Sequence, residues 1–230
     1  MNPNALDSHM PGEIVNDALS QAIVEVFRQQ RPQRVLEIGA STGEGSTQVL
    51  LGALASDRSA PPPRLFSLEA GEGRFAALCK RHAAVSADRF CPMLGSSCGP
   101  DEFPDAEEVR RFVEDTPGNL LKQYGVETVL GWLANDVAYL RAHPQVPTDG
   151  IERVRSAHGI AVFDAVVIDG SEFLGSRELE KVIGAGIIIL DDIRTFKCWH
   201  AHARLVADSR YRLATHLPHL RNGASIFVRK

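Results

Sequence analysis

The chain has 230 residues, 44% of them hydrophobic, and carries a formal net charge of −4 at pH 7. This length and apolar content allow one sizeable core, so we expect a single domain, with residues 1–11 as a flexible arm. The slight acidity gives no electrostatic case for nucleic acid as a partner, and the apolar runs are too short to span a membrane. The N-terminus has no basic-then-apolar signal segment, and the four cysteines show no C-x-x-C spacing, which favours free thiols in a reducing cytoplasm.

Up to residue 98, short apolar strands alternate with amphipathic helices. The predicted order is helix 14–29, strand 35–38, helix 47–54, strand 64–69, helix 75–84 and strand 90–94. This alternation predicts a Rossmann-like, doubly wound α/β fold with a mostly parallel sheet.

Residues 99–161 interrupt the alternation, because about 60 residues stand where one crossover helix would be sufficient. Helical stretches are predicted near residues 105–115, 120–141 and 150–157, and the middle one carries an apolar stripe that must pack on another surface. We interpret this helical insert as a lid that shapes a binding pocket. A structural buttress or a dimerisation surface is the alternative, and a homo-oligomer stays open. Candidate acceptor contacts in the insert are Trp132, Asn135, Asp136 and Tyr139.

The second half of the chain resumes the alternation. The predicted order is strand 163–168, helix 177–182, strand 186–190, helix 194–207, a strand-like segment from residue 211 and a final strand at 224–228. Asn222-Gly223 is a hairpin-type turn signal before that final strand. We therefore expect the sheet, with seven predicted strands in all, to end in an antiparallel hairpin.

The turn at residues 39–46, Gly-Ala-Ser-Thr-Gly-Glu-Gly-Ser, connects a strand to a helix whose N-terminal amides point at the same place. Ser41 stands where a dinucleotide fingerprint has its second glycine, and the turn lacks the lysine of a phosphate-binding loop. Glu37 and Glu44 also make the turn a poor site for phosphates. A cofactor with a cationic end and no phosphate, such as S-adenosylmethionine, suits it better. The alternative is a strand-turn-helix that binds nothing.

This segment resembles motif I of class I S-adenosylmethionine-dependent methyltransferases, acidic-x-Gly-x-Gly-x-Gly. Glu37, Gly39 and Gly43 match the motif. Ser41 replaces the middle glycine, as in the E-I-G-x-x-T-G turn of metal-dependent catechol-type O-methyltransferases. The resemblance covers residues 35–97 and 162–230 and does not extend to the insert.

The resemblance implies that Glu69, at the end of the second strand, holds the ribose hydroxyls of the cofactor, and that a Gly-Ser turn after the third strand lies beside the adenine. For Glu69 the alternative is a solvated loop residue, and for the Gly-Ser turn it is an ordinary polar turn. The implied cofactor contacts are Glu37, Gly39, Ala40, Ser41, Gly43, Ser46, Glu69, Ser96, Ser97 and Asp169.

Three aspartates follow two buried strands that should be neighbours. Asp169 ends one strand, and Asp191 and Asp192 end the next. Carboxylates that converge at one sheet edge repel each other unless a cation lies among them, and hard oxygen ligands select Mg²⁺ or Ca²⁺. The pattern is similar to the Asp, then Asp-Asp site of macrocin-type sugar and antibiotic O-methyltransferases. The alternative is that Asp192 caps the helix that follows it.

The sequence therefore predicts S-adenosylmethionine-dependent methyl transfer to a small-molecule hydroxyl, on a sugar or a secondary metabolite, assisted by Mg²⁺ bound to Asp169, Asp191 and Asp192. Lys197 and His200 are the candidate general bases. The alternatives are a metal-independent methyltransferase with Asp169 as the base, a non-catalytic binding protein with this fold and, more remotely, a nicotinamide oxidoreductase. We interpret Cys198-Trp-His-Ala-His202 as a helix surface rather than a zinc site, because His200 points away from the other two.

Overall fold

The computed structural model describes residues 14–57 and 59–230, so the arm predicted at residues 1–11 lies outside the described residues. Its centre is a seven-stranded sheet with the order β3-β2-β1-β4-β5-β7-β6, in which β7 runs antiparallel to both of its neighbours and the other pairings are parallel. The strands are β1 (Arg34–Ile38), β2 (Arg64–Glu69), β3 (Phe90–Leu94), β4 (Ala165–Ile168), β5 (Ile187–Asp191), β6 (Tyr211–Leu217) and β7 (Ala224–Arg229). The predicted mostly parallel sheet with a C-terminal antiparallel hairpin is confirmed.

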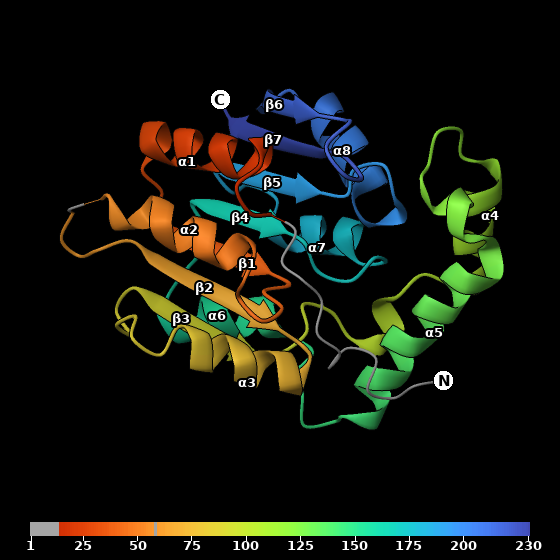
Figure 1. The fold of residues 1–230 in the computed structure, drawn as a ribbon, viewed down its shortest axis with the longest axis horizontal. Helices are drawn as coiled ribbons and strands as arrows, with labels where there is room; N and C mark the ends of the chain where they lie inside the picture. Colours follow the sequence, from red (N-terminus) through yellow and green to blue (C-terminus); the bar gives the residue numbers. More distant parts are fainter. Residues whose placement is uncertain (1–13, 58) are drawn as a thin grey trace.

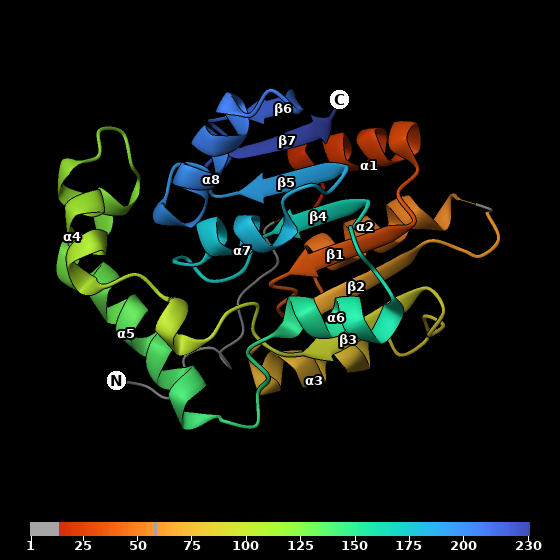
Figure 2. The same cartoon turned by 180° about the vertical axis from the view of Figure 1, so that it is seen from behind.

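Helices cover both faces of this sheet (Figures 1 and 2). The first face carries α1 (Ala18–Gln30), α2 (Ser46–Ala55) and α3 (Glu72–Arg81). The opposite face carries α6 (Gly150–His158), α7 (Gly175–Val182) and α8 (Phe196–Ala207). The predicted doubly wound architecture is therefore confirmed.

The strands alternate their side chains between two apolar cores, one on each face of the sheet. Leu36 lies level with Phe66 and Val166, and all three pack in the core under α6, α7 and α8. Val35 and Ala165 are neighbours on the other face and pack against α1, α2 and α3. Because both faces are covered, β4 and β5 are almost continuously apolar, as is typical of parallel strands.

The connections place a crevice between β1 and β4. The chain leaves β1 through α2 on one face, whereas it enters β4 from α6 on the other face. At such a switch point the loops after neighbouring strands diverge, and ligands of open α/β sheets bind there, outside the carboxyl ends of the strands.

The insert lies beyond these carboxyl ends, where α4 (Ala106–Asp115) and α5 (Val126–Ala142) stand apart from the layers of the sheet (Figure 1). Two short 3₁₀ helices, η2 (Pro100–Glu102) and η3 (Leu121–Tyr124), connect these elements. The helix α6, which we had expected within the insert, instead packs on the sheet through Ile151 and Val154 and serves as the crossover to β4.

Several predicted boundaries were wrong for local reasons. The single helix predicted over residues 120–141 is broken at Gly125, whose φ of 77° a helix cannot contain. The first helix begins at Ala18 rather than at residue 14, because Asp17 and Ser20 form a capping box. Across the described ranges 14–57 and 59–230, no helix combines the length and apolarity that crossing a membrane requires.

Candidate functional site

A cavity of about 610 Å³ opens at the carboxyl ends of the strands. Its walls come from the segments that follow β1, β2, β3, β4 and β5 and from the insert, so it occupies the crevice at the switch point. Of the predicted site residues, those that line it are Gly39, Ala40, Ser41, Ser46, Glu69, Ser96, Ser97, Asp169, Asp191, Asp192 and Lys197.

The turn after β1 is fixed against its neighbours by backbone contacts. The amides of Gly39 and Ala40 both donate to the carbonyl of Leu68, at 3.0 Å. Gly39 has a φ of 88°, and a Cβ atom at this position would collide with the backbone carbonyl of Asp169. Only glycine therefore lets the ends of β1 and β4 lie this close.

Two members of the motif support the turn instead of lining the cavity. Glu37 is fully buried in β1 and accepts hydrogen bonds from the hydroxyls of Ser46, Thr47 and Ser67. Burial raises the pKa of Glu37, and these three bonds offset that effect only in part. Gly43 packs beneath α3, where its carbonyl lies 3.0 Å from Nε2 of His82. Glu37 and Gly43, both predicted as cofactor contacts, therefore lie behind the cavity wall, where their polar groups contact other residues of the protein.

Glu69 is held at the tip of β2, on the cavity wall. Only 5% of Glu69 is exposed, so it is not a solvated loop residue. One carboxylate oxygen accepts the amide of Ser41 and the other that of Gly71, each at 2.7 Å. Burial raises the pKa of Glu69 against the opposing effect of these bonds. The contact with Ser41 joins the β1 turn to the β2 tip and orients both toward the cavity.

The turn after β3 meets a buried carboxyl that sequence reasoning missed. The hydroxyl of Ser96 donates to the carbonyl of Cys98 at 2.7 Å, and that of Ser97 donates to Oε1 of Glu178 at 2.6 Å. Glu178 is fully buried, and burial raises its pKa to about 7. Within the described part of the chain, its Oε2 has no hydrogen-bond partner. Its position in the buried stripe of α7, three residues after Gly175 and four before Val182, could have revealed it.

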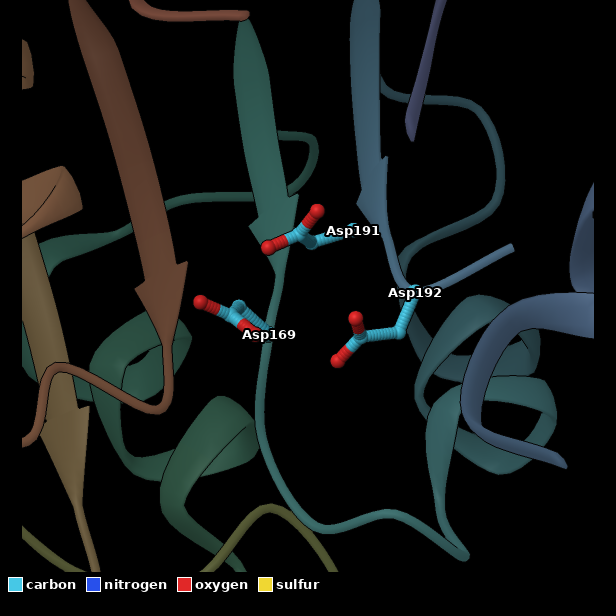
Figure 3. A group of neighbouring side chains, drawn as sticks. All are labelled: Asp169, Asp191 and Asp192. Atoms are coloured by element: carbon cyan, nitrogen blue, oxygen red, sulfur yellow. The ribbon is translucent and has the colours of Figure 1, made fainter. Parts of the chain in front are cut away.

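The three predicted aspartates converge, as Figure 3 shows, with their carboxylates turned toward a common space between the ends of β4 and β5. One oxygen from each of the three lies within 4.8 Å of the others. Asp192 does not cap α8 with its side chain, because the capping residue is Thr195. Asp192 instead adopts a φ of 57°, a left-handed conformation that aspartate tolerates better than most residues.

Basic side chains already pair with these carboxylates. Nζ of Lys197, in the first turn of α8, lies 2.9 Å from Oδ1 of Asp169 and 2.6 Å from Oδ2 of Asp192. Arg221 donates to both oxygens of Asp191, at 2.9 and 3.1 Å, and also pairs with Asp17 at the start of α1. The amide of Asn222 donates to the second oxygen of Asp192 at 3.0 Å. The two residues from the β6–β7 loop were not predicted as part of the site.

The electrostatics of this cluster decide the roles of its members. Burial, and then the charges of Asp169 and Asp192, raise the pKa of Asp191 to about 7. Burial also opposes ionisation of Asp192, but the ammonium of Lys197 outweighs it and lowers that pKa. Burial disfavours the charged form of Lys197, yet the surrounding carboxylates raise its pKa well above the ordinary value. A raised pKa favours the protonated form of Lys197, so these contacts suit a hydrogen-bond donor better than the predicted general base.

His200 does not take the role of a base either. It lies almost one turn further along α8, exposed, with its ring 5.9 Å from that of Phe112 in α4 and outside the cavity lining. Two other members of that helix segment, Cys198 and His202, contact different parts of the protein. Cys198 is buried against the carbonyl of Ile168, whereas Nδ1 of His202 lies 3.0 Å from the hydroxyl of Ser225.

The insert contributes part of the cavity wall. Trp132, Asn135 and Asp136 of α5 line it, as predicted for acceptor contacts. Tyr139 does not, because it is fully buried and its hydroxyl accepts the amide of Glu72 at 2.9 Å. Oδ2 of Asp136 accepts a 2.7 Å hydrogen bond from the hydroxyl of Ser171, in the loop after β4. That bond ties the insert to the sheet at the edge of the site.

Comparison with known proteins shows what this architecture is similar to. No family model matches the sequence, and no curated protein matches it significantly. Among solved structures, an O-methyltransferase from Bacillus cereus in complex with SAH is 15% identical, with a TM-score of 0.58 over 96% of this chain and 84% of that one. A putative caffeoyl-CoA O-methyltransferase from Staphylococcus aureus is 14% identical, with a TM-score of 0.56 over 94% of this chain and 85% of that one.

A third structure, the O-methyltransferase TomG of Streptomyces achromogenes in complex with SAM, is 13% identical and has a TM-score of 0.50 over 96% of this chain and 83% of that one. Each of the three likenesses extends over at least 94% of this chain, so the similarity is one of the overall fold. The chain therefore has the Rossmann-like fold of class I O-methyltransferases.

Proposed function

We propose that this chain binds S-adenosylmethionine in the cavity and transfers its methyl group to a hydroxyl of a small molecule. The observation that carries the proposal is Glu69, a buried carboxylate at the tip of β2 that lines the cavity and accepts the amides of Ser41, in the β1 turn, and of Gly71. A carboxylate in this place can accept both hydroxyls of a ribose.

The residues present fit the rest of such a cofactor. The turn at residues 39–46 contains no lysine or arginine, so it suits a sulfonium and ammonium group better than a phosphate. The hydroxyls of Ser41 and Thr42 are buried at the cavity and have no hydrogen-bond partner within residues 14–57 and 59–230. Solved structures of similar fold hold SAM or SAH, which supports the same choice here.

The cofactor would supply an electrophilic methyl group, and the chain would supply orientation and proton transfer. The acceptor oxygen would attack the methyl carbon in line with the breaking carbon–sulfur bond, leaving a neutral thioether. Asp169 would take the hydroxyl proton as the new carbon–oxygen bond forms, because it lines the cavity beside the β1 turn. Holding the oxygen in line supplies much of the rate enhancement in such a reaction.

Magnesium assistance, which the three aspartates suggested, fits the observed arrangement poorly. The carboxylate oxygens are the right ligands for a hard cation. However, the ammonium of Lys197 already bridges two of the carboxylates, and Arg221 pairs with the third. A divalent ion about 4 Å from that ammonium would be repelled by about 8 kcal/mol at an effective dielectric constant near 20. The proposed methyl transfer therefore proceeds without a metal.

The acceptor would lie between the strand ends and α5. Trp132 offers an aromatic face, and Asn135 and Asp136 offer hydrogen bonds, a combination that suits a hydroxylated ring such as a sugar or a secondary metabolite. We also propose that the protein works in the cytoplasm, which its free cysteines support.

The test is methyl transfer from methyl-labelled S-adenosylmethionine to pools of hydroxylated small molecules. We expect label in a methyl ether of one pool, formed together with stoichiometric S-adenosylhomocysteine. If the protein binds S-adenosylhomocysteine but labels no pool, the enzymatic proposal fails and a non-catalytic binding protein remains. If the label enters an amine instead, the acceptor class is wrong.

A further inference from the structure

The ammonium of Lys197 occupies the centre of the aspartate cluster. It reaches Asp169 on β4 and Asp192 after β5 at 2.9 and 2.6 Å, and only 8% of Lys197 is exposed. The residue lies in the first turn of α8 between Phe196 and Cys198, which are also buried, so packing directs its side chain back to the strand ends. This lysine is therefore a built component of the cluster.

Each of the three carboxylates is paired with a basic side chain of the same chain. Arg221 takes both oxygens of Asp191, and Asn222 takes the oxygen of Asp192 that Lys197 leaves. Both residues come from the β6–β7 loop, which the pairing of Ala224 with Asp191 holds against the end of β5. Two separate elements, α8 and this loop, thus deliver charge and donors to the same three side chains.

A divalent ion and this ammonium compete for the same place. A magnesium ion bound to these aspartates would lie about 2.1 Å from an oxygen of each. The oxygens in question lie within 4.8 Å of one another, and Lys197 already hydrogen-bonds one oxygen on each of two aspartates. Entry of the ion would require the lysine to leave a buried position and both of its carboxylate partners.

We infer that the Lys197 ammonium holds the place that a divalent cation holds among such carboxylates, and that methyl transfer here needs no metal. The second part rests on the function proposed above. A lysine ammonium has three N–H groups, and two point to Asp169 and Asp192, which leaves one for an acceptor oxygen in the cavity. That bond would stabilise the oxygen as it loses its proton to Asp169 and forms the bond to the methyl carbon.

Binding of Mn²⁺, measured by the loss of its free electron paramagnetic resonance signal, tests the substitution without reference to activity. We expect no stoichiometric binding by the wild-type protein. The Lys197→Met variant keeps the length of the side chain without its charge, and we expect it to bind Mn²⁺ at least about tenfold more tightly than the wild type, because its carboxylates are left unbalanced. Lys122→Met removes an exposed lysine of η3 that is not among the cavity-lining residues and donates to the carbonyl of Glu114. It is the matched control and should bind as the wild type does.

Stoichiometric Mn²⁺ binding by the wild type would overturn the inference, and so would a Lys197→Met protein, folded by circular dichroism, with unchanged Mn²⁺ affinity. The wild-type measurement stands even if the variant fails to fold. Activity that EDTA abolishes and Mg²⁺ restores would also contradict it. A protein that binds neither Mn²⁺ nor S-adenosylhomocysteine would refute the proposed function but leave the assignment of the lysine intact.

Discussion

At the scale of single residues, Glu178 links the site to the pH dependence of stability. Its pKa is about 7 in the folded protein, because burial outweighs the hydrogen bond from Ser97, and about 4.5 in the unfolded chain. Between pH 4.5 and about pH 7, Glu178 keeps its proton in the folded state and loses it in the unfolded state. Glu178 therefore contributes stability that is complete below about pH 4.5 and is lost as the pH rises through 7. The difference corresponds to about 3 kcal/mol.

We predict that Glu178→Gln, whose amide resembles the protonated acid, is more stable than the wild type at pH 8 by up to about 3 kcal/mol. At pH 4.5 the two proteins should be nearly equal. Urea unfolding at both values measures the difference, and Glu180→Gln, at an exposed position on the same helix, is the control. An advantage of the variant that did not change with pH would show that Glu178 is ionised when folded.

Gly39 permits a close approach that no other residue allows. Its φ of 88° strains any side chain, and a Cβ would in addition collide with Asp169, whereas Gly118, with a φ of 77°, faces open space. We expect Gly118→Ala to lower the free energy of unfolding by about 1–2 kcal/mol. Gly39→Ala should lower the free energy of unfolding by about 1–3 kcal/mol more than Gly118→Ala does, because the backbone must shift. Thermal and urea denaturation compare the two, and equal losses would mean that the turn moves freely.

The aspartates of the site could be predicted from the sequence, but their basic partners could not. Asp169, Asp191 and Asp192 were predicted together because the ends of neighbouring parallel strands meet at one edge. Their partners were not, since the positions of Lys197 and Arg221 depend on how α8 and the β6–β7 loop pack. A signal did exist for the loop: a final antiparallel strand beside β5 must begin where β5 ends, so the residues before Ala224 lie near Asp191.

At the scale of elements, the insert is joined to the sheet by apolar packing and by hydrogen bonds, among them the one between Tyr139 and Glu72. Its helices α4 and α5 form an apolar cluster that Phe173, Phe196 and Trp199 join from outside the insert. A polar connection at the cavity is the 2.7 Å hydrogen bond from Ser171 to Asp136. A single bond of this kind contributes about 1 kcal/mol.

We predict that Ser171→Ala raises amide hydrogen exchange in the α5 segment about fivefold, the factor that 1 kcal/mol corresponds to, and leaves the strands unchanged. Exchange followed by mass spectrometry is the measurement, with Ser209→Ala, at an exposed position after α8, as the control. Unchanged protection of α5 would show that the other contacts of the insert hold this helix in place without the Ser171 bond.

Elements with a strong periodic pattern were predicted best. The strands and both layers of helices followed from alternation and apolar runs, since burial on both faces leaves a clear signature. The insert was harder to predict, because the apolar stripe of α5 indicates that this helix packs on another surface but does not identify that surface. Gly125 and the capping residue Asp17 set boundaries that the periodicity did not contain.

At the scale of the whole molecule, one topological fact organises the site. The strand order places β1 and β4 side by side with their connections on opposite faces, and the cavity opens there. The resemblance in the first turn anticipated this fold, and solved O-methyltransferases at 13–15% identity share it. The acceptor could not be anticipated in the same way, because its side of the cavity belongs to the insert, where the resemblance ends.

We propose that this cavity binds S-adenosylmethionine without a metal. Isothermal titration of S-adenosylhomocysteine into the protein in buffer containing EDTA tests it most directly, with NAD⁺ as the comparison ligand. We predict one-to-one binding with a dissociation constant on the order of micromolar and no heat from NAD⁺. If the protein binds neither S-adenosylhomocysteine nor S-adenosylmethionine, the cavity is not the site of this cofactor. If it binds them only after Mg²⁺ is restored, binding needs a metal.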